Sequence, residues 1–157
     1  MSDDLIVTAR RLAKANPARP RQADLKRPVS TAYYALFHAL ARQCADLLIG
    51  VGQDRSDPAW TQVYRSLEHG VAKSACKAAA NAGFPNGIIN FADTFVSMQE
   101  ERRNADYNPD TRYTRPDVLL LISNAEQAIA SLKGESRRDR RAFAVWVLLQ
   151  RRRWGAQ

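Results

Sequence analysis

Between Ala23 and Ile49 the chain carries a continuous stripe of apolar residues. The stripe recurs every three or four residues, which is the period of an amphipathic α-helix with one buried face. Its members are Val29, Tyr33, Leu36, Phe37, Leu40, Cys44, Leu47 and Leu48. Because a single helix cannot cover its own apolar face, the stripe predicts a fold in which further helices pack around it.

Other stretches show the same helical period, and none alternates apolar and polar residues as a strand does. The further expected helices are Asp3–Ala15, a third from Asp57-Pro58 with an apolar side reaching Val71 and a break near His69-Gly70, a fourth from Ile88 to Ala105, a fifth from Asp117, and a sixth from Arg137 to Arg153. We therefore predict an all-α fold. Residues 1–134 form a four-helix up-and-down bundle with an additional short N-terminal helix, and residues 135–157 form a basic amphipathic helix that packs on the bundle or extends it.

The net charge of +8 is concentrated at the two ends of a chain whose 157 residues suit one domain. Residues 1–27 carry seven basic and three acidic side chains, residues 28–132 carry nine and eleven, and residues 133–157 carry eight and two. Basic ends around a near-neutral middle are typical of a protein that contacts an anionic partner, although simple solvation of the charges gives the same pattern.

Several classes of protein are disfavoured by what the sequence lacks. No apolar run approaches the ~18 residues of a membrane span, and the first residues have no apolar segment of a secretion signal. The sequence has no glycine-rich phosphate loop, no CxxC and no HExxH. Cys44 and Cys76 are expected to be buried in a reducing compartment, and His38 and His69 to be structural. We predict a cytoplasmic protein with no metal, no cofactor and no integral membrane association.

The densest polar cluster spans residues 100–109, near the end of the fourth expected helix. At 100° per residue, Arg102 falls almost directly over Phe91 and Phe95, on the face that packs against the core. A charge at this position needs a partner, and Asp106, four residues later, can supply an ion pair. Two interpretations follow: the pair locks the end of the helix, or the arginine is held in a cleft to bind an anion such as phosphate.

Three short motifs together resemble the HEPN superfamily over roughly residues 5–132. The segment Arg27-Pro-Val-Ser-Thr-Ala-Tyr-Tyr-Ala-Leu-Phe-His-Ala-Leu40 resembles the helix around the AYYA-F-A core of that superfamily. Glu101-Arg-Arg-Asn-Ala-Asp-Tyr107 is similar to the RxxADY segment of its short stand-alone bacterial members. His69-Gly70-Val71 falls where those proteins often have an HG or HxG element. The sixth expected helix lies outside the resemblance.

The resemblance implies a helical, dimerising protein of a toxin–antitoxin or other defence system. Many members are metal-independent ribonucleases in which an arginine binds the scissile phosphate and a histidine, four to six residues later, moves protons across a dimer cleft. Carried over, the arginine is Arg102, and Tyr107 stands where the histidine would be. Because a phenol with a pKa near 10 is a poor general base at neutral pH, this departure favours RNA or nucleotide binding with ribonuclease chemistry degenerate or absent.

Two alternatives stay open. One is an active metal-independent ribonuclease whose composite site at a dimer interface uses Arg102 with Tyr107 or another residue. The other is a structural dimerisation or partner module. The resemblance also implies a homodimer and a small nucleotidyltransferase-type antitoxin partner, which in some pairs modifies a HEPN tyrosine, here Tyr107.

Basic residues flank the apolar run Ala142–Leu149 of the sixth expected helix. This helix can pack on the bundle or on a second subunit, bind nucleic acid with Trp154 stacked on a base, or lie on an anionic membrane surface. With the polar cluster of the fourth helix, its arginines complete the set of candidate phosphate and RNA contacts. The candidates are Arg102, Arg103, Asn104, Asp106, Arg137, Arg138, Arg140, Arg141, Arg151, Arg152 and Arg153.

Overall fold

The computed structural model describes residues 1–150 of the chain. Within this range seven α-helices and no strand are present, which confirms the all-α prediction. The helices are α1 (Ser2–Ala13), α2 (Gln22–Ile49), α3 (Asp57–Ser66), α4 (His69–Ala78), α5 (Asn86–Tyr107), α6 (Arg115–Lys133) and α7 (Arg137–Leu148). None of these seven helices combines the length and the apolar composition needed to cross a membrane.

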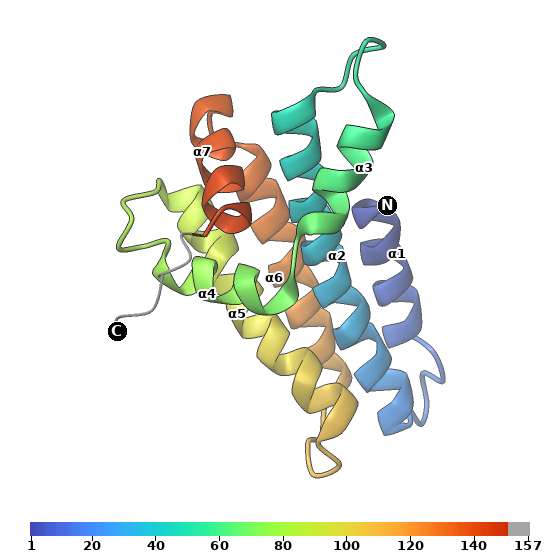
Figure 1. Ribbon diagram of the computed structural model, residues 1–157. Helices are drawn as coiled ribbons and strands as arrows, with labels where there is room; N and C mark the ends of the chain where they lie inside the picture. The colour runs from blue at the N-terminus through green and yellow to red at the C-terminus, as the bar shows by residue number, and fades with distance from the viewer. Residues whose placement is uncertain (151–157) are drawn as a thin grey trace.

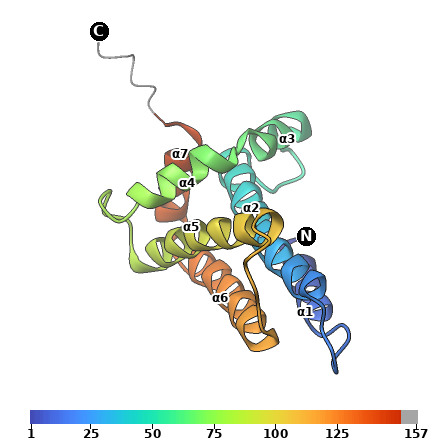
Figure 2. The same cartoon turned by 90° about the horizontal axis from the view of Figure 1, so that it is seen from below.

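Helix α2 runs through the centre of the molecule and packs against α1, α3, α5, α6 and α7. In Figure 1, α1 descends beside α2, α2 returns upward, α5 descends and α6 returns upward, so these helices alternate in direction. The view from below shows α1 beside α2 and α5 beside α6 (Figure 2). Helix α3 packs on α2, and α4 packs against both α5 and α7.

The core is built largely from the apolar faces that helical spacing predicts. All members of the α2 stripe are buried except Phe37, which is half-buried, and Leu48, which is 36% exposed. Fully buried side chains of α5, α6 and α7 complete this core, among them Ile88, Phe91, Phe95, Met98, Val118, Ile122, Leu132 and Phe143. Cys44 and Cys76 are free and buried, and burial raises the pKa of both thiols to about 12. Both therefore behave as small apolar side chains.

The third expected helix is divided into two, and the break falls just before His69-Gly70. Leu67 closes α3 with an extended backbone (φ −69°, ψ 123°), and Glu68 repeats this conformation (φ −110°, ψ 136°) before α4 begins. The expected apolar side through Val71 is therefore not one continuous helical face. The break turns the Leu67 side chain into the core, where it is 6% exposed.

Helix α3 has no fully buried residue; Val63 and Tyr64 are partly buried against the core, and polar contacts also hold the helix to α2. Trp60 Nε1 donates a hydrogen bond to Asp46 Oδ1 at 2.8 Å. The Tyr64 hydroxyl hydrogen-bonds His38 Nδ1, and their rings stack. The attachment of α3 thus depends on a few side chains at its inner surface.

Helix α7 begins at Arg137 as predicted but ends at Leu148, so the expected continuation through Leu149 and Gln150 is wrong. Leu149 leaves helical geometry (φ −111°, ψ 56°), and its side chain is 70% exposed because the apolar face of the helix has ended. The final part of the expected helix, residues 151–153, lies outside the described range.

The apolar side of α7 packs on the bundle. Phe143 and Val147 are buried, and Phe143 meets the ring of Phe91 edge-on. Trp146 Nε1 donates a hydrogen bond to the main-chain oxygen of Ala75 at 2.9 Å. Of the three roles considered for this helix, the described residues show the packing contacts, and Trp146 takes part in them.

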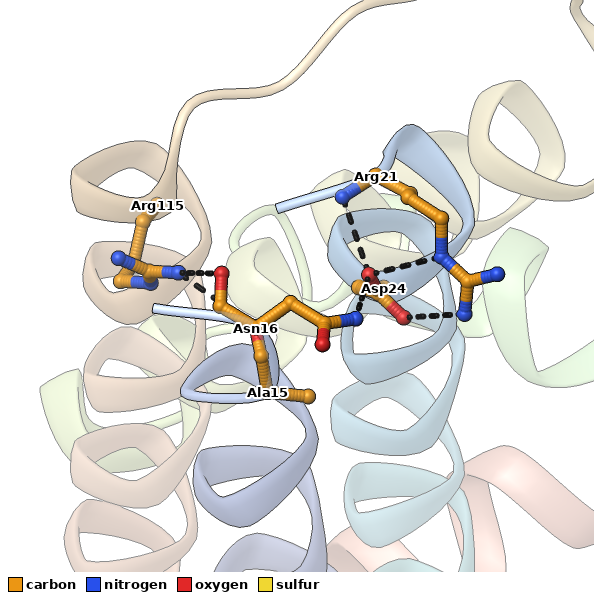
Figure 3. Close-up of polar contacts among 5 residues, drawn as sticks. All are labelled: Ala15, Asn16, Arg21, Asp24 and Arg115. Carbon is orange, nitrogen blue, oxygen red and sulfur yellow. Dashed lines mark hydrogen bonds and ion pairs between the residues drawn. The ribbon is translucent and has the colours of Figure 1, made fainter. Parts of the chain in front are cut away.

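Arg115, the first residue of α6, fastens the loop that follows α1. Its guanidinium donates hydrogen bonds to the main-chain oxygens of Ala13 and Pro17 at 2.9 Å, of Asn16 at 3.2 Å and of Ala15 at 3.5 Å. Figure 3 shows it pointing toward the chain at Asn16. The Ala13 oxygen is one of those that the end of a helix leaves without an intrahelical partner, and the other three belong to the loop after α1.

Asp24 ties the same loop to α2. Asn16 has a left-handed backbone (φ +49°), which asparagine tolerates better than most residues, and its Nδ2 donates to Asp24 at 2.9 Å. The main-chain N–H and the guanidinium of Arg21 donate to the same carboxylate at 3.0 to 3.2 Å (Figure 3). Hydrogen bonds from Arg21 first, then Asn16, hold the pKa of Asp24 well below its usual range.

Candidate functional site

Helix α5 carries Arg102 at the outer end of its buried face. Phe91 and Phe95 on this face are fully buried, whereas the Arg102 side chain is 16% exposed. The structure therefore places Arg102 where the helical spacing predicts, at the edge of the core. Most of the side chain is enclosed, and its Nε atom is buried.

Two tyrosines of α2 lie against the Arg102 guanidinium. Its Cζ atom is 5.1 Å from the ring centroid of Tyr33 and 5.8 Å from that of Tyr34. Both distances lie within the range in which an aromatic face attracts a cation. Tyr33 is fully buried and Tyr34 is 36% exposed, so one ring fixes the arginine from the core side and the other also reaches solvent.

Asp106 provides the carboxylate partner that the i,i+4 spacing predicts. Arg102 Nη1 lies 3.7 Å from Asp106 Oδ2, which is an ion pair too long to be a hydrogen bond. The other carboxylate oxygen accepts a hydrogen bond from the Ser30 hydroxyl of α2. Arg102 Nε is buried and has no hydrogen-bond partner within residues 1–150. The guanidinium is thus held in place but incompletely hydrogen-bonded.

His69, at the start of α4, lies in the same neighbourhood. Its Nδ1 is hydrogen-bonded to the Tyr33 hydroxyl at 2.6 Å, and its ring stacks on Phe37 with centroids 3.9 Å apart. Burial first, and then the charges of Arg102 and His38, lower the pKa of His69, which keeps the imidazole neutral at pH 7. We call the following residues the Arg102 cluster: Ser30, Tyr33, Tyr34, His69, Arg102 and Asp106.

A shallow hollow adjoins the cluster between the first half of α2 and the end of α5. Arg27 is exposed at this hollow, and Lys26 Nζ donates a hydrogen bond to the main-chain oxygen of Asn108 at 3.3 Å. Two cations and the outer ring of Tyr34 therefore line one depression. The lining residues are Leu12, Ala23, Lys26, Arg27, Ser30, Thr31, Tyr34, Ala105 and Asp106.

Six residues of this neighbourhood are not among the candidate contacts predicted from the sequence. They come from α2 and α4, so no spacing within α5 points to them: Lys26, Arg27, Ser30, Tyr33, Tyr34 and His69. All of them except Lys26 lie within the quoted HEPN-like motifs, which was the one signal available.

The other candidates at the end of α5 face a different direction. Tyr107 is 76% exposed and lines a separate hollow with Arg103, Asn104 and Lys73 of α4. Helical geometry sets residues five positions apart about 140° around the axis from one another. Within one chain, the structure therefore does not bring Tyr107 together with Arg102.

The basic residues of α7 lie apart from the Arg102 cluster. Arg137 and Arg140 line a cavity against the C-terminal half of α2, whereas the cluster contacts its N-terminal half. Arg138 and Arg141 are exposed and do not line that cavity. The remaining candidates, Arg151, Arg152 and Arg153, lie outside the described residues. The basic candidates thus belong to at least two surfaces.

Neither metal-site geometry nor similarity to other proteins adds to this description. Among residues 1–150, no group of three or more His, Cys, Asp and Glu side chains is arranged to hold a metal ion. The chain matches no family model, and comparison with curated proteins and with solved structures finds no similar protein. The chemistry of the site is therefore argued from its own geometry.

Proposed function

We propose that the protein is a HEPN-like four-helix-bundle protein that binds RNA or a nucleotide through the Arg102 cluster. It acts in the cytoplasm as a component of a toxin–antitoxin or other defence system, and ribonuclease chemistry is degenerate or absent. The observation that carries the proposal is the Arg102 guanidinium, which is fixed between two aromatic rings and has an incomplete set of hydrogen bonds. The HEPN-like motifs that include these residues support the same assignment.

A phosphate group suits this arrangement better than Asp106 alone does. Guanidinium groups bind phosphate through paired, charge-assisted hydrogen bonds, whereas the present ion pair is 3.7 Å long. Asp106 already has a second partner in Ser30, so its carboxylate remains satisfied when Arg102 turns to a ligand. Arg27 lies along the adjoining hollow for a neighbouring phosphate, and the exposed ring of Tyr34 offers a surface on which a base can stack.

Cleavage requires a group that takes a proton from the attacking 2′-hydroxyl, and the pair implied by the family motif lacks it. Tyr107 stands where the family has histidine, and within one chain it lies on another side of α5. We propose that the protein is a homodimer with a nucleotidyltransferase-type antitoxin partner. In such a dimer Tyr107 of one copy can approach Arg102 of the other, but its phenol is a poor base at neutral pH.

Binding of a short fluorescent single-stranded RNA, followed by anisotropy, tests the proposal. Arg102→Ala should weaken binding about tenfold or more and reduce the slope of affinity against salt by about 0.7, because one phosphate contact is lost. Arg65→Ala, at an exposed position of α3, is the matched control and should change affinity less than about twofold. Light scattering on the same samples should give twice 17.6 kDa.

Unchanged RNA and nucleotide binding in Arg102→Ala would contradict the proposal and favour the structural alternatives. Arg102 would then be an ion-paired helix lock in a dimerisation or partner module. A folded Arg102→Ala variant is verified by its melting curve, which should lie a few degrees below that of the wild type because an ion pair and two cation–π contacts are lost.

The active-ribonuclease alternative is favoured by one observation: His69 lies close enough to Arg102 for the arginine charge, after burial, to lower its pKa. We expect no cleavage of single-stranded RNA by the wild type in EDTA. Cleavage that disappears in both Arg102→Ala and His69→Ala would establish a ribonuclease with His69 as the base. Cleavage lost in Arg102→Ala and Tyr107→Phe would instead indicate a tyrosine-assisted site across a dimer interface.

A further inference from the structure

A cavity of about 500 Å³ lies where four helices meet, away from the Arg102 cluster. Its walls come from the start of α1, the C-terminal half of α2, the end of α6 and the first turn of α7. The start of α1 can be found beside α2 in Figure 1. Because small-molecule sites commonly measure about 300–1,000 Å³, the cavity has the size of a metabolite site.

Gln43 is the feature of this cavity that folding alone does not explain. It belongs to α2, lines the cavity and is 8% exposed. Its Nε2 is buried and has no hydrogen-bond partner within residues 1–150. A buried amide without a partner destabilises a fold, whereas an apolar side chain of similar size at this position does not. Because Nε2 is closed to solvent, the Gln43 side chain has to turn toward the cavity before a ligand there accepts its hydrogen bond and removes this penalty.

Two arginines give the cavity an unbalanced positive charge. Arg137 and Arg140 both line it from the first turn of α7, and neither forms an ion pair within residues 1–150. Arg140 uses Nε to donate to the main-chain oxygen of Glu135 at 3.0 Å, which fixes the side chain and leaves its terminal nitrogens for another acceptor. The positive end of the α7 dipole adds to the attraction for an anion.

The other charges that line the cavity largely cancel one another. Arg42 lies 3.6 Å from Asp46, and Lys133 lies 3.8 Å from Asp3. These two ion pairs leave the charges of Arg137 and Arg140 as the excess among the lining side chains. The ligand that complements the cavity is therefore an anion.

One part of the wall is apolar. Leu47, Ile129 and Leu132 line the cavity but are largely covered, so the larger apolar surface at the cavity belongs to Met1 and Val51, which are 63% and 75% exposed. Inorganic phosphate alone gains nothing from such a wall. A ligand that joins an anionic group to a ring uses both the charged and the apolar surfaces.

We propose that this cavity binds a small organic phosphate with an apolar ring, of the size of a nucleoside monophosphate. The phosphate lies at Arg137 and Arg140, Gln43 Nε2 donates to an acceptor on the ligand, and the ring packs against the apolar wall. Gln43 follows Tyr33 by ten residues, which is about 15 Å along α2. The site is thus separate from the Arg102 cluster, and the proposal does not rest on the function assigned to that cluster.

Isothermal titration calorimetry of the full chain with adenosine monophosphate, adenosine and inorganic phosphate tests the ligand class. The nucleotide should bind at least about tenfold more tightly than either of its parts, since each part uses one wall of the cavity. Equal affinity for inorganic phosphate would overturn the assignment of an organic ligand. No detectable nucleotide binding at millimolar concentration would overturn the site itself.

Variants then locate the ligand. Arg137→Ala and Arg140→Ala should each weaken nucleotide binding about tenfold or more. Arg138→Ala and Arg141→Ala are the matched controls, since they remove the same charge from the same turns of α7 outside the cavity lining. They should change affinity less than about threefold at physiological salt. Equal losses in all four variants would indicate a diffuse basic surface and overturn the proposal.

Gln43→Leu separates a ligand contact from a structural role. We expect this variant to melt at the same temperature as the wild type or higher, while its affinity for the nucleotide falls at least about fivefold. A lower melting temperature with unchanged affinity would show that Gln43 serves the fold, and the proposal would fail. Loss of binding in Arg102→Ala but not in Arg137→Ala would place the nucleotide in the Arg102 cluster, which also overturns it.

Discussion

Replacing Arg115 with alanine removes the residue that fastens the end of α1 to α6. The guanidinium makes four contacts with main-chain oxygens, and those to Ala13 and Pro17, at 2.9 Å, have good hydrogen-bond length. A hydrogen bond from a charged donor contributes about 1.5–3 kcal/mol when it is well buried. Because part of this group is exposed, each of the two short bonds should contribute a free energy near or below the lower end of that range, and the two longer bonds should contribute little. The expected cost is about 2–3 kcal/mol.

For a domain of this size, each kcal/mol shifts the melting temperature by about 2–4 °C. Arg115→Ala should therefore melt about 5–10 °C below the wild type in calorimetry or circular dichroism. Arg115→Lys keeps the charge but loses the planar fork that reaches several oxygens, so its melting temperature should lie between the two. Arg112→Ala, at an exposed position three residues earlier, is the control and should melt within about 1 °C of the wild type.

A melting temperature of Arg115→Ala within about 2 °C of the wild type would refute this reasoning. It would mean that water replaces the guanidinium at the carbonyl groups with no net cost. The same outcome would show that Asp24, through Asn16, holds the loop by itself. A double substitution with Asp24→Asn would then reveal the coupling between the two fastenings.

Two further predictions concern the site and the packing of the long helices. The pKa of His69, measured by NMR titration, should lie below 6.5 and should rise in Arg102→Ala, because burial and the arginine charge both lower it. An unchanged pKa in this variant would show that the Arg102 charge does not act on His69. Since the unfolded chain binds more protons below pH 6.5, the free energy of unfolding should decrease as pH falls through that value. Gly87→Ala places a Cβ 2.7 Å from the main-chain oxygen of Ser131, so it should lower the melting temperature by several degrees, whereas Gly70→Ala, with open space around it, should leave that temperature unchanged or slightly higher.

The sequence predicts those parts of the fold that depend on spacing along one helix. The buried stripe of α2, the position of Arg102 above Phe95 and its ion pair with Asp106 all follow from the helical period. Each of these features is local, because it compares residues within a few turns. The agreement between these predictions and the structure therefore does not depend on which helices pack together.

The remaining features depend on contacts between distant segments, which the period of a single helix does not encode. The chain leaves helical geometry at Leu67 because the core accepts its side chain there, and α7 ends at Leu148 where its buried face ends. Tyr33 and His69 meet across α2 and α4, thirty-six residues apart. The helical period of the sequence therefore predicts the arginine and its carboxylate but not their aromatic and histidine neighbours.

The weak attachment of α3 has a consequence for the native-state dynamics of the protein. Since no residue of α3 is fully buried, and Val63 and Tyr64 are only partly buried against the core, detaching α3 exposes less apolar surface than detaching α2 would, and it breaks a few side-chain contacts such as that of Trp60 with Asp46. Such a segment opens by local fluctuation at a far lower free energy than the whole domain unfolds. Amide hydrogens of α3 will exchange with solvent long before those of the central helix. The domain thus contains a small independent unfolding unit, α3, which contacts His38. His38 lies on α2, the helix that also carries Tyr33 and Gln43.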